Sequence, residues 1–545
     1  MNNMFQIWRE IKDVYLKYID TGLPLKNSLL EDERRLLFEN GDSVSKMPIV
    51  EFTPKYSEYR TLTETCRELN LDERFADFAK RGLFRDRGSV ESKIYRHQFN
   101  SIDAAVVKRK NIIATTGTGS GKTECFLFPL VYDILIEKLN TKKNTDAVRG
   151  LILYPLNALA EDQMRRLRVS LGSAQSIDWL QRNAKSTFIT FGRYTSSTPF
   201  PGDRIKKRSK LEKEHLNLQK DWENAKKYHD QENDREEYLY DTPNMDYPIE
   251  YWDRWTIQDT PPDILVTNYS MLNIILMRES EQNIFEQTKL WLEEDPKNVF
   301  HLVVDELHTY RGTSGSEVAY LLRLLLKRLG LSPNSPQVQF LCSSASMQQG
   351  ERSKKFISNF FGIDEASYED SFEIISDEPV SFSGTCEKLD CAKFLNELGS
   401  DPKEIQRIFD QHGILKLLQR ILIKPIEADQ IIDQMFKNGS PQEQLTALEN
   451  LLSSLTYLKD DKGNAVQAQR AHYFFKNIDG LWACTNKECP EVEAQFLYHG
   501  RNVGKLYKRP QKTCGCGSLV LEILTCRQCG EIYIMVGLTS QKNPF

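Results

Sequence analysis

The stretch that decides the fold is Ala114 to Glu124, which reads ATTGTGSGKTE and follows the apolar run Asn111 to Ile113. Its glycines let backbone N–H groups converge on phosphate oxygens, the lysine supplies a point charge for the β and γ phosphates, and the threonine hydroxyl can ligate Mg²⁺. A strand, a tight loop and a helix N-terminus are the context that this motif requires. The residues predicted to hold the nucleotide are Thr118, Gly119, Ser120, Gly121, Lys122, Thr123 and Glu124.

The loop departs from the generic phosphate-loop pattern at one position. Thr116 stands where the pattern has its first glycine, and the glycine of this chain is Gly117. A glycine-rich turn with a chance Lys-Thr pair is the alternative interpretation. Because every physical part of the phosphate cradle is present, the stretch predicts a site for ATP and Mg²⁺.

Length and composition describe a multidomain globular chain. At 545 residues, with 40% hydrophobic and 27% charged residues, it has room for about three to four domains. No run of about 18 apolar residues predicts a membrane span, and the N-terminus has no apolar segment of a secretory signal, so we expect a cytoplasmic protein without membrane contact. The net charge of −5 excludes a polybasic protein, although a local basic groove remains compatible with nucleic-acid binding.

Polar residues that surround the loop in sequence fit a nucleotide site. Gln98 precedes the loop, and its amide can pair with both edges of an adenine, although such a residue is often on a helix surface. Asp305 and Glu306 follow the apolar run HLVV, at the end of a strand where parallel sheets bind ligands. We predict that Asp305 holds Mg²⁺ and that Glu306 orients the attacking water, while a surface turn is the alternative. The helix after them is predicted to start at Ser316.

Two other apolar runs, at 150–153 and 264–266, end in small polar residues. Such side chains, and a helix N-terminus after the first run, are placed to contact sugar or phosphate oxygens, although ordinary loops would also fit. The predicted nucleic-acid contacts are Pro155, Asn157, Thr267 and Asn268. The run VQFLC ends in Ser343 to Ser346, whose hydroxyls either couple the two sites or cap the next helix.

Two helical regions flank this pattern. Between about 199 and 244 the chain is dense in charge, which predicts a solvated helical insertion. The alternative is a clamp for the phosphate backbone, carried by Arg204, Lys206, Lys207, Arg208 and Lys210. From about 402 to 458 the pattern is again helical, with a capping box at Ser440.

Six of the 11 cysteines fall between 484 and 529, which favours a metal over disulfides or leftover core thiols. Structural Zn²⁺ takes four thiolates, so six cysteines leave the ligand set open. The first choice is Cys484, Cys489, Cys514 and Cys516, with Cys526 and Cys529 as substitutes. The nearby Lys505, Lys508, Arg509 and Lys512 fit either phosphate contacts or a solvated surface.

The ordered set IYRHQ, TGTGSGKTE, YPLNALAEDQ, PDILVTNYSML, VVDELHTYRG and SSAS resembles the first motor lobe of superfamily-two DExH-box helicases. The DELHTYRG stretch and the cysteine pairs resemble the large bacterial members related to the mitomycin repair factor, some of which occur in antiphage defence islands. The resemblance implies ATP, Mg²⁺, DNA and 3′ to 5′ movement. It assigns adenine recognition to Gln98, phosphate and metal contacts to Lys122, Thr123, Asp305 and Glu306, and coupling to His308, Ser344 and Ser346.

The expected fold is α/β, a RecA-like P-loop domain with a parallel sheet, joined to N-terminal accessory helices, a helical module and a small zinc module. The predicted boundaries are 1–88, 89–375 with an insertion at about 199–250, 376–470 and 471–545. No Gln-Gly-Arg-Arg type motif follows Ser346, so the resemblance implies a motor half whose second lobe comes from another polypeptide or a missing segment. We therefore expect weak hydrolysis by this chain alone. The rival hypothesis is a nucleotide-gated DNA-binding or scaffold subunit.

Overall fold

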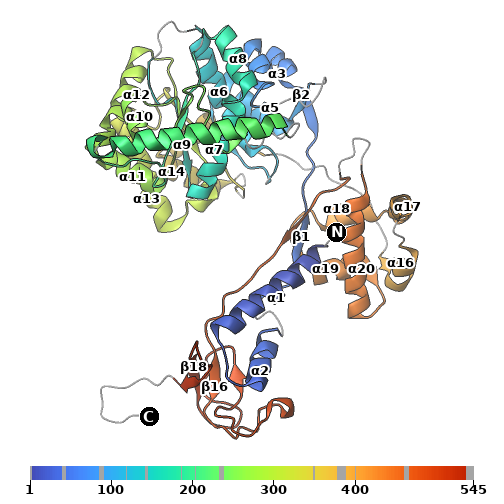
Figure 1. Cartoon of the computed structure of the whole chain (residues 1–545). Coiled ribbons are helices and arrows are strands. Elements are labelled where there is room, and N and C mark those ends of the chain that lie inside the picture. Colours follow the sequence, from blue (N-terminus) through green and yellow to red (C-terminus); the bar gives the residue numbers. More distant parts are fainter. Residues whose placement is uncertain are drawn as a thin grey trace. The chain divides into compact units, whose positions relative to one another are not determined.

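The computed structural model describes residues 3–39, 44–84, 91–117, 119–140, 145–185, 187–202, 204–231, 239–345, 347, 350–376, 388–398, 401–459 and 465–534. Contacts divide the chain into two compact units (Figure 1). One comprises Pro54–Val380 and the other combines Met1–Thr53 with Ser381–Phe545.

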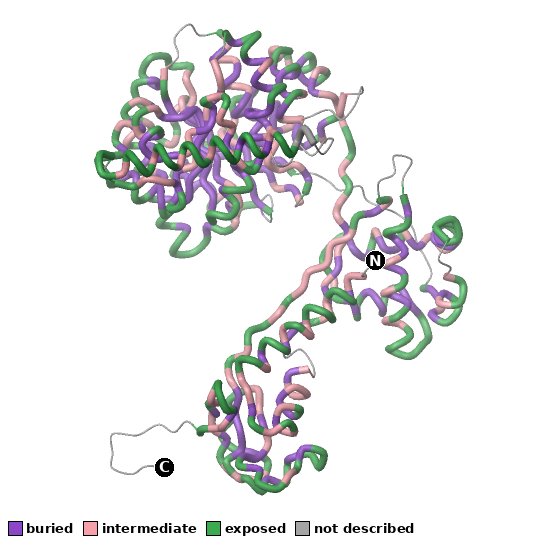
Figure 2. The backbone as a smooth tube through the Cα atoms, viewed as in Figure 1, coloured by how far each residue is buried: buried purple, intermediate pink, exposed green. Residues whose placement is uncertain are grey.

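The first unit, which we name the ATPase unit after the nucleotide site that the sequence predicts in it, is built on an eight-stranded sheet. All neighbouring strands of this sheet pair in parallel. The central strands are buried along their whole length, because helices cover both faces of the sheet (Figure 2). In spatial order the strands are β11 (Phe372–Ile375), β4 (Asn111–Ala114), β10 (Val338–Ser343), β9 (Phe300–Val304), β5 (Gly150–Tyr154), β8 (Ile264–Asn268), β6 (Phe191–Tyr194) and β7 (Glu250–Tyr251). The predicted α/β fold with a parallel sheet is confirmed.

Each face of the sheet has its own apolar core, since alternate side chains of a strand point to opposite faces. One core holds the helices α3 (Leu62–Glu68), α4 (Glu73–Ala79), α5 (Arg96–Ile102), α6 (Lys122–Asn140), α7 (Asn157–Leu171) and α8 (Ala174–Asn183). The other holds α10 (Arg254–Asp259), α11 (Tyr269–Met277), α12 (Gln282–Glu294), α13 (Gly312–Arg328) and α14 (Glu351–Phe361). The smaller pieces of this unit are the paired strands β2 (Glu58–Thr61) and β3 (Lys93–Tyr95) and the short helix α15 (Tyr368–Ser371).

The start predicted for α13 is wrong. The helix begins at Gly312 rather than at Ser316, and Arg311 is its N-cap. A side chain at Gly315 would lie 2.3 Å from the carbonyl oxygen of Tyr310, so this first turn requires small residues. The apolar period begins only at Val318, and the pattern therefore hides the first turn.

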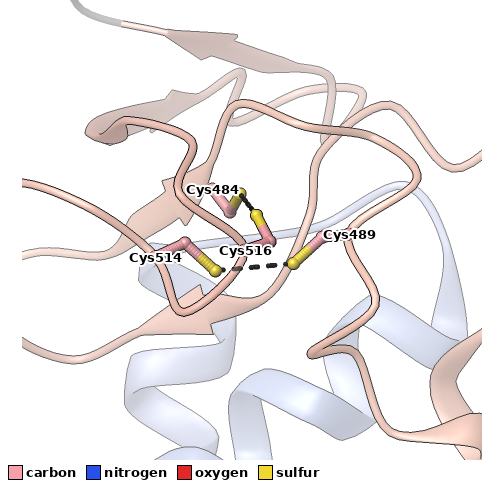
Figure 3. Close-up of side chains that lie close together, drawn as sticks. All are labelled: Cys484, Cys489, Cys514 and Cys516. Atoms are coloured by element: carbon pink, nitrogen blue, oxygen red, sulfur yellow. Dashed lines mark hydrogen bonds between the residues drawn. The ribbon is translucent and has the colours of Figure 1, made fainter.

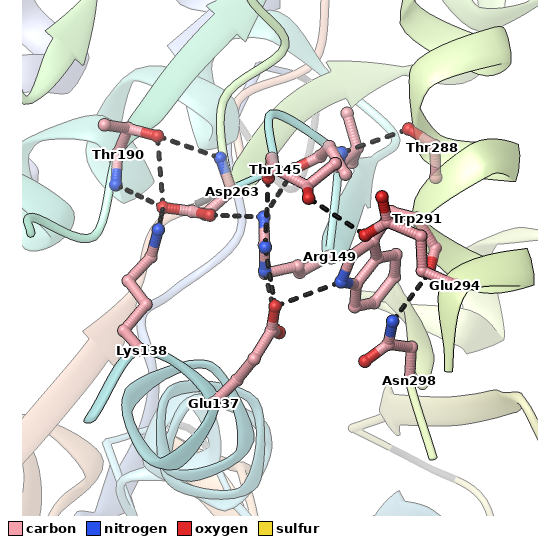
Figure 4. A network of polar contacts seen from close by, with 12 residues as sticks. Glu137, Lys138, Thr145, Arg149, Thr190, Asp263, Thr288, Trp291, Glu294 and Asn298 are labelled. Atoms are coloured by element: carbon pink, nitrogen blue, oxygen red, sulfur yellow. Dashed lines mark hydrogen bonds and ion pairs between the residues drawn. The ribbon is translucent and has the colours of Figure 1, made fainter. Parts of the chain in front are cut away.

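A buried polar network joins the amino ends of β5, β8 and β6 (Figure 4). Asp263, just before β8, accepts from Nη1 of Arg149 at 2.8 Å and from the backbone N–H of Thr190 at 2.8 Å, and Nζ of Lys138 lies 3.0 Å away. The same Arg149 donates to Glu137 at 2.6 Å and stacks its guanidinium over the Trp291 ring. This network fixes the strands at the edge of the sheet opposite to the predicted sites.

The second unit combines both parts of the sequence outside the ATPase unit. Its core packs α1 (Met4–Gly22), α2 (Ser28–Glu39) and β1 (Ile49–Phe52) with residues that lie more than 300 positions later. The later elements are β12 (Leu389–Asp390), α16 (Cys391–Glu397), α17 (Pro402–His412), α18 (Ile414–Ile421), β13 (Ile426–Glu427), α19 (Ala428–Met435), β14 (Phe436–Lys437), α20 (Pro441–Ser454) and β15 (Gln469–His472). The predicted capping box at Ser440 is confirmed at the start of α20.

A four-stranded sheet near the C-terminus has the spatial order β17 (Leu506–Tyr507), β16 (Trp482–Cys484), β18 (Val520–Thr525) and β19 (Ile532–Ile534). Its neighbours pair antiparallel, and its loops carry the clustered cysteines. Apolar residues of α1 and α2, such as Leu16 and Leu30, pack against Leu481 and Ile523 of this sheet region. The N-terminal helices therefore form part of the support of the cysteine-rich module.

Candidate nucleotide site, nucleic-acid edge and metal site

The phosphate loop runs from the end of β4 to the start of α6 at Lys122. Gly119 and Gly121 have φ values of 81° and 75°, in the left-handed region that favours glycine. A side chain at Gly121 would also come within 2.3 Å of Nε2 of Gln98. The predicted Thr118 lies outside the described residues, and the remaining loop has the strand, turn and helix context that the motif requires.

Lys122 is the strongest sign of an anion site. Its Nζ is buried and has no hydrogen-bond partner in the described part of the chain, and its nearest carboxylate oxygen belongs to Glu306 at 3.9 Å. A buried ammonium group normally has its donors satisfied, since an unmet donor costs about 1–3 kcal/mol. The phosphates of a nucleotide would supply these missing acceptors.

Hydrogen bonds of two hydroxyl groups stabilise the phosphate loop internally. Thr116, the position that departs from the pattern, lies 2.5 Å from Oγ of Ser120, and Ser120 donates to the carbonyl of Gly117 at 2.7 Å. The ring of His97 contacts the Ser120 carbonyl through Nε2 at 2.8 Å. The departure at Thr116 thus adds an internal bond that glycine cannot make, and sequence patterns gave no sign of the His97 contact.

Gln98 lies directly beside this loop. Its side chain is 1% exposed, its Oε1 accepts from the Tyr95 backbone N–H at 2.9 Å, and its Nε2 donates to the Gly121 carbonyl at 3.3 Å. The amide therefore ties α5 to the phosphate loop. Each of its two polar atoms has the capacity for one further hydrogen bond.

The Asp-Glu pair follows β9, and β10 lies between it and the phosphate loop. The Glu306 backbone N–H donates to Asp305 at 3.0 Å and to Ser343 Oγ at 3.2 Å, and the Ser343 hydroxyl donates to Asp305. Glu306 itself has a φ of 51°, a strained value for a residue with a side chain. This turn brings its carboxylate back toward Lys122, so the two motifs form one site.

Two contacts at this site were not predicted. The Ser343 hydroxyl donates to Asp305, whereas the family resemblance assigns coupling to Ser344 and Ser346. Arg166 of α7 donates from Nη1 to the Thr123 hydroxyl at 3.1 Å and also pairs with Asp162 at 3.1 Å. The register of β10 decides the first contact and the rotation of α7 decides the second, and neither has a local sequence signal.

The predicted coupling residues lie near the same turn. Nδ1 of His308 is 3.2 Å from a Glu306 carboxylate oxygen and 3.3 Å from the backbone nitrogen of Ala345. The Ser344 hydroxyl is buried without a partner in the described ranges, and its backbone N–H bonds to the Ala114 carbonyl. Ser346 lies outside the described residues. His308 therefore links the Asp-Glu turn to the loop after β10.

A second polar edge lies at the ends of β5, β8 and β6. The amide of Asn268 donates to the side chain of Asn157, which in turn donates to Ser196 Oγ at 3.2 Å, and Asn268 also caps α11. The side chain of Thr267 is fully buried and donates to the Tyr194 carbonyl, so it supports this edge from below. Pro155 ends β5 just before the N-terminus of α7.

Four cysteines of the C-terminal sheet region meet at one point (Figure 3). Their sulfur atoms all lie within 4.8 Å of one another, with Cys484 to Cys516 at 3.6 Å and Cys489 to Cys514 at 3.5 Å. Metal–sulfur bonds of about 2.3 Å in a tetrahedron put sulfur atoms about 3.8 Å apart, which matches this spacing. The four cysteines are therefore positioned to bind a metal ion.

The surroundings of this cluster also fit a metal. A side chain at Gly504 would lie 2.7 and 2.8 Å from Cβ of Cys489 and Cys484, so only glycine allows the loop to close. Burial raises the pKa of the Cys484 thiol to about 12, while hydrogen bonds from Ser518 lower the pKa of the Cys516 thiol to about 6. A central cation would stabilise all four thiolates together.

Cys526 and Cys529 are not part of this four-sulfur group. They lie in the turn between β18 and β19, where Gly530 donates to the Cys526 carbonyl. Backbone N–H groups of Cys529 and Gln528 lower the pKa of the Cys526 thiol. The turn thus holds a second thiol pair, in which Cys526 is half-buried and Cys529 is exposed.

The sheet, the phosphate loop and the Asp-Glu turn define the nucleotide-binding lobe of a P-loop ATPase. A family model for DEAD/DEAH box helicases matches residues 95–190, and a second model, the YjiV N-terminal domain, matches residues 506–544. The segment matched by the DEAD/DEAH box model lies within the ATPase unit, in agreement with the predicted resemblance to superfamily-two helicases.

The chain is also similar to curated proteins. Over 97% of its length, this chain is 26% identical to the Druantia protein DruE of Escherichia coli (strain UMEA 4076-1), and the match covers 32% of that protein. It is 27% identical over 54% of its length to the uncharacterized ATP-dependent helicase YprA of Bacillus subtilis (strain 168), covering 27% of that protein. The chain thus spans about a third or less of the length of these relatives.

Among solved structures, the DUF1998 helicase MrfA bound to DNA matches with a TM-score of 0.35 and 20% identity, over 64% of this chain and 32% of that chain. Within the described ranges, no helix has the length and apolar character needed to cross a membrane.

Proposed function

We propose that this chain is the ATP-binding lobe of an ATP-dependent DNA translocase or helicase. The observation that carries the proposal is the buried Lys122 ammonium, which lacks a hydrogen-bond partner among the described residues and lies beside the Glu306 carboxylate. A cation at this position in a P-loop contacts the β and γ phosphates. Helicase relatives of the DEAD/DEAH type support the same reaction class.

In this proposal each residue contacts a different part of the nucleotide, the metal ion or the attacking water. Lys122 and the loop from Gly119 to Glu124 hold the phosphates, and Gln98 recognises adenine. Thr123 and Asp305 would hold Mg²⁺, which neutralises charge that develops on the phosphoryl oxygens. Glu306 orients and polarises the attacking water, and its strained turn directs the carboxylate at Lys122.

Coupling to nucleic acid passes from the Asp-Glu turn to the ends of neighbouring strands. His308, Ser344 and Ser346 carry this coupling in the proposal, and the contact of His308 with the loop after β10 supports it. Pro155, Asn157, Thr267 and Asn268 form or support the edge that meets the DNA backbone, where small polar groups and the N-terminus of α7 bind phosphate oxygens. The direction of movement is 3′ to 5′.

We further propose that fast hydrolysis needs a second RecA-like lobe, supplied by another polypeptide or a further segment. The described residues contain one large parallel sheet, and in P-loop ATPases an arginine from outside the phosphate loop contributes about 10³ to 10⁵ in rate. A nucleotide-gated DNA-binding or scaffold subunit is the second candidate, favoured by the same single sheet. The two differ in whether a second lobe restores turnover.

The metal of the cysteine cluster is zinc in this proposal, because a closed set of four thiolates in a tetrahedral arrangement is typical of structural Zn²⁺. Cys484, Cys489, Cys514 and Cys516 are its ligands in this proposal, and Cys526 and Cys529 are alternative ligands that could replace one of them. A cytoplasmic location stays a prediction.

Equilibrium binding of a fluorescent ATP analogue tests the nucleotide site directly. Wild-type protein should bind it with Mg²⁺, and Lys122→Ala should weaken binding by at least about 10-fold, since a charge-assisted bond contributes about 1.5–3 kcal/mol. Lys110→Ala is a matched control, because Lys110 contacts the Glu369 carbonyl at the opposite end of β4. Equal binding by wild type and Lys122→Ala would refute the site.

A further inference from the structure

The longest helix of the ATPase unit, α9 (Arg204–Gln231), has 28 residues and almost no apolar face of its own. It lies along the outside of the lobe, and most of its visible surface is exposed (Figures 1 and 2). An isolated helix of this composition would gain little from burial, so its attachment points decide whether it is held rigidly.

Several contacts fix α9 to the lobe. Trp222 and Ala225 are 7% and 8% exposed, and Trp222 lines a small cavity with Arg168 and Tyr240. Lys226 forms an ion pair with Asp246 at 3.0 Å near the end of the helix. At its start, Arg204 donates to Asp259 at 2.8 Å. The helix is therefore held at its start and near its end.

The opposite side of α9 carries a stripe of lysines. At about 100° per residue, five lysines fall within about 60° of one line that faces away from Trp222. Asparagines fill the line at 217 and 224, and every acidic residue of α9 up to position 228 lies outside it. All five lysines are exposed, and they are Lys206, Lys210, Lys213, Lys220 and Lys227, which we name the lysine stripe.

The lysine stripe differs from the basic run that the sequence suggested. Arg204 pairs with Asp259, Arg208 pairs with Glu212 at 3.3 Å, and Lys207 donates to the carbonyl of Pro201. Lys210, Lys213 and Lys220 form no ion pair with any residue that the structure describes. A helix that needed charge only for solubility would mix both signs along this line, whereas here the line holds lysines and asparagines and the acidic residues lie to either side of it.

We propose that the lysine stripe binds the phosphate backbone of duplex DNA alongside the lobe. From Lys206 to Lys227 the helix rises about 32 Å, which equals about nine base pairs at 3.4 Å per phosphate of one strand. A straight, rigid row of ammonium groups matches the regular charge of a duplex better than a flexible single strand. The inference rests on the proposed DNA-binding function and names a second contact site for it.

The attachment of α9 also connects the stripe to the polar edge. The loop from Thr195 to Gly202 joins the end of β6 to α9, and it includes Ser196, which bonds to Asn157. Arg254 holds this loop through the carbonyls of Thr195 at 2.9 Å and Thr198 at 3.1 Å. A duplex bound to the lysine stripe would thus contact a helix that is anchored to the same loop as the polar edge.

The test compares two triple variants of the full chain. Lys210→Gln, Lys213→Gln and Lys220→Gln remove three stripe charges while keeping good helix formers. Lys289→Gln, Lys297→Gln and Lys327→Gln remove three exposed charges from the region of the amino ends of β9 and β10. Thermal unfolding and binding of the ATP analogue check that both variants are folded and keep their nucleotide site.

The readout is the affinity for a labelled 20-base-pair DNA duplex between 50 and 200 mM KCl. Loss of three phosphate contacts lowers the salt slope by about 2.7, so the added salt should weaken the wild type about 40-fold more than the stripe variant. The control variant should keep the wild-type slope. Equal slopes for all three proteins would overturn the inference.

Other outcomes separate the inference from the proposed function. If single-stranded DNA loses as much affinity as duplex in the stripe variant, the stripe binds single strands and the duplex assignment is overturned. If the wild type binds no duplex but binds single-stranded DNA and ATP, the stripe inference fails while the proposed function stands. If it binds neither nucleic acid nor ATP, the proposed function itself fails.

Discussion

Replacement of Asp263 by asparagine should destabilise the ATPase unit without changing its nucleotide affinity. The carboxylate is 2% exposed and faces Nζ of Lys138 at 3.0 Å and Nη1 of Arg149 at 2.8 Å. Asp263→Asn keeps the shape but leaves two buried cations facing a neutral amide. Removing one partner of a buried ion pair costs about 3–5 kcal/mol, which lowers the melting temperature of a unit of this size by about 4–7 °C.

The effect should depend on pH. Burial alone raises the pKa of the Asp263 carboxyl, but Lys138, Arg149 and a bond from Thr190 outweigh burial and hold that pKa below its usual range. A lowered pKa in the folded state contributes stability above the unfolded value of about 3.9, and that contribution disappears as the pH falls through the folded value. The gap between wild type and Asp263→Asn should be constant from pH 5 to 8 and shrink below about pH 4.

Thermal unfolding followed by circular dichroism at several pH values measures this gap. Asp246→Asn is the matched control, because Asp246 pairs with Lys226 at 3.0 Å while both side chains are nearly half exposed, so its loss should cost less than about 1 kcal/mol. An Asp263→Asn protein that melts within about 2 °C of wild type at pH 7 would refute the reasoning. So would a gap that is just as large at pH 3.

Three further predictions concern the sites. Gly121→Ala should weaken binding of the ATP analogue by more than about 10-fold, because the new Cβ would lie 2.3 Å from Gln98 Nε2 and the backbone φ there is 75°. The control is Gly22→Ala at an exposed position, which should leave binding of the analogue unchanged. Ser343→Ala should slow ATP hydrolysis about 10- to 100-fold at unchanged ATP affinity, because it removes the hydrogen bonds of Ser343 to Asp305 and to the Glu306 N–H. An unaltered rate of hydrolysis would show that Ser343 does not position these two residues. Cys489→Ser should lower the amount of bound zinc, measured by elemental analysis, and should destabilise the second unit. The control Cys529→Ser should keep one zinc per chain. Equal loss of zinc in both variants would contradict the four-sulfur site.

Much of the ATPase unit could be predicted because its signals are local. Buried parallel strands appear as short apolar runs, and the residues that follow them carry the chemistry, as with Lys122 after β4 and Asp305 after β9. The phosphate loop also imposes a conformation that glycine alone adopts easily, which made Gly119 and Gly121 recognisable.

The remaining details depend on contacts between distant segments. Ser343 rather than a later serine reaches Asp305 because β10 lies between β4 and β9, with Ser343 paired to Ala114. The rotation of α7 brings Arg166 to Thr123, and the folding of two loops selects four of six cysteines. A sequence pattern contains none of these distances.

The lysine stripe also depends on contacts that the sequence alone does not show. The charged run from Arg204 onward was visible, but its first residues pair with Asp259 and Glu212. The burial of Trp222 and Ala225 shows which side of α9 faces the lobe, and therefore which lysines are exposed together on the other side.

ATP hydrolysis by the purified chain, measured with and without saturating single-stranded DNA and with Glu306→Gln as control, shows whether this chain needs a second lobe for turnover. We expect the chain to bind ATP and Mg²⁺ but to hydrolyse ATP slowly, with little stimulation by DNA until a second lobe is added. DNA-stimulated turnover near the typical enzyme value of about 10 s⁻¹, abolished by Glu306→Gln, would contradict the need for a second lobe. Absence of ATP binding would contradict the nucleotide site itself.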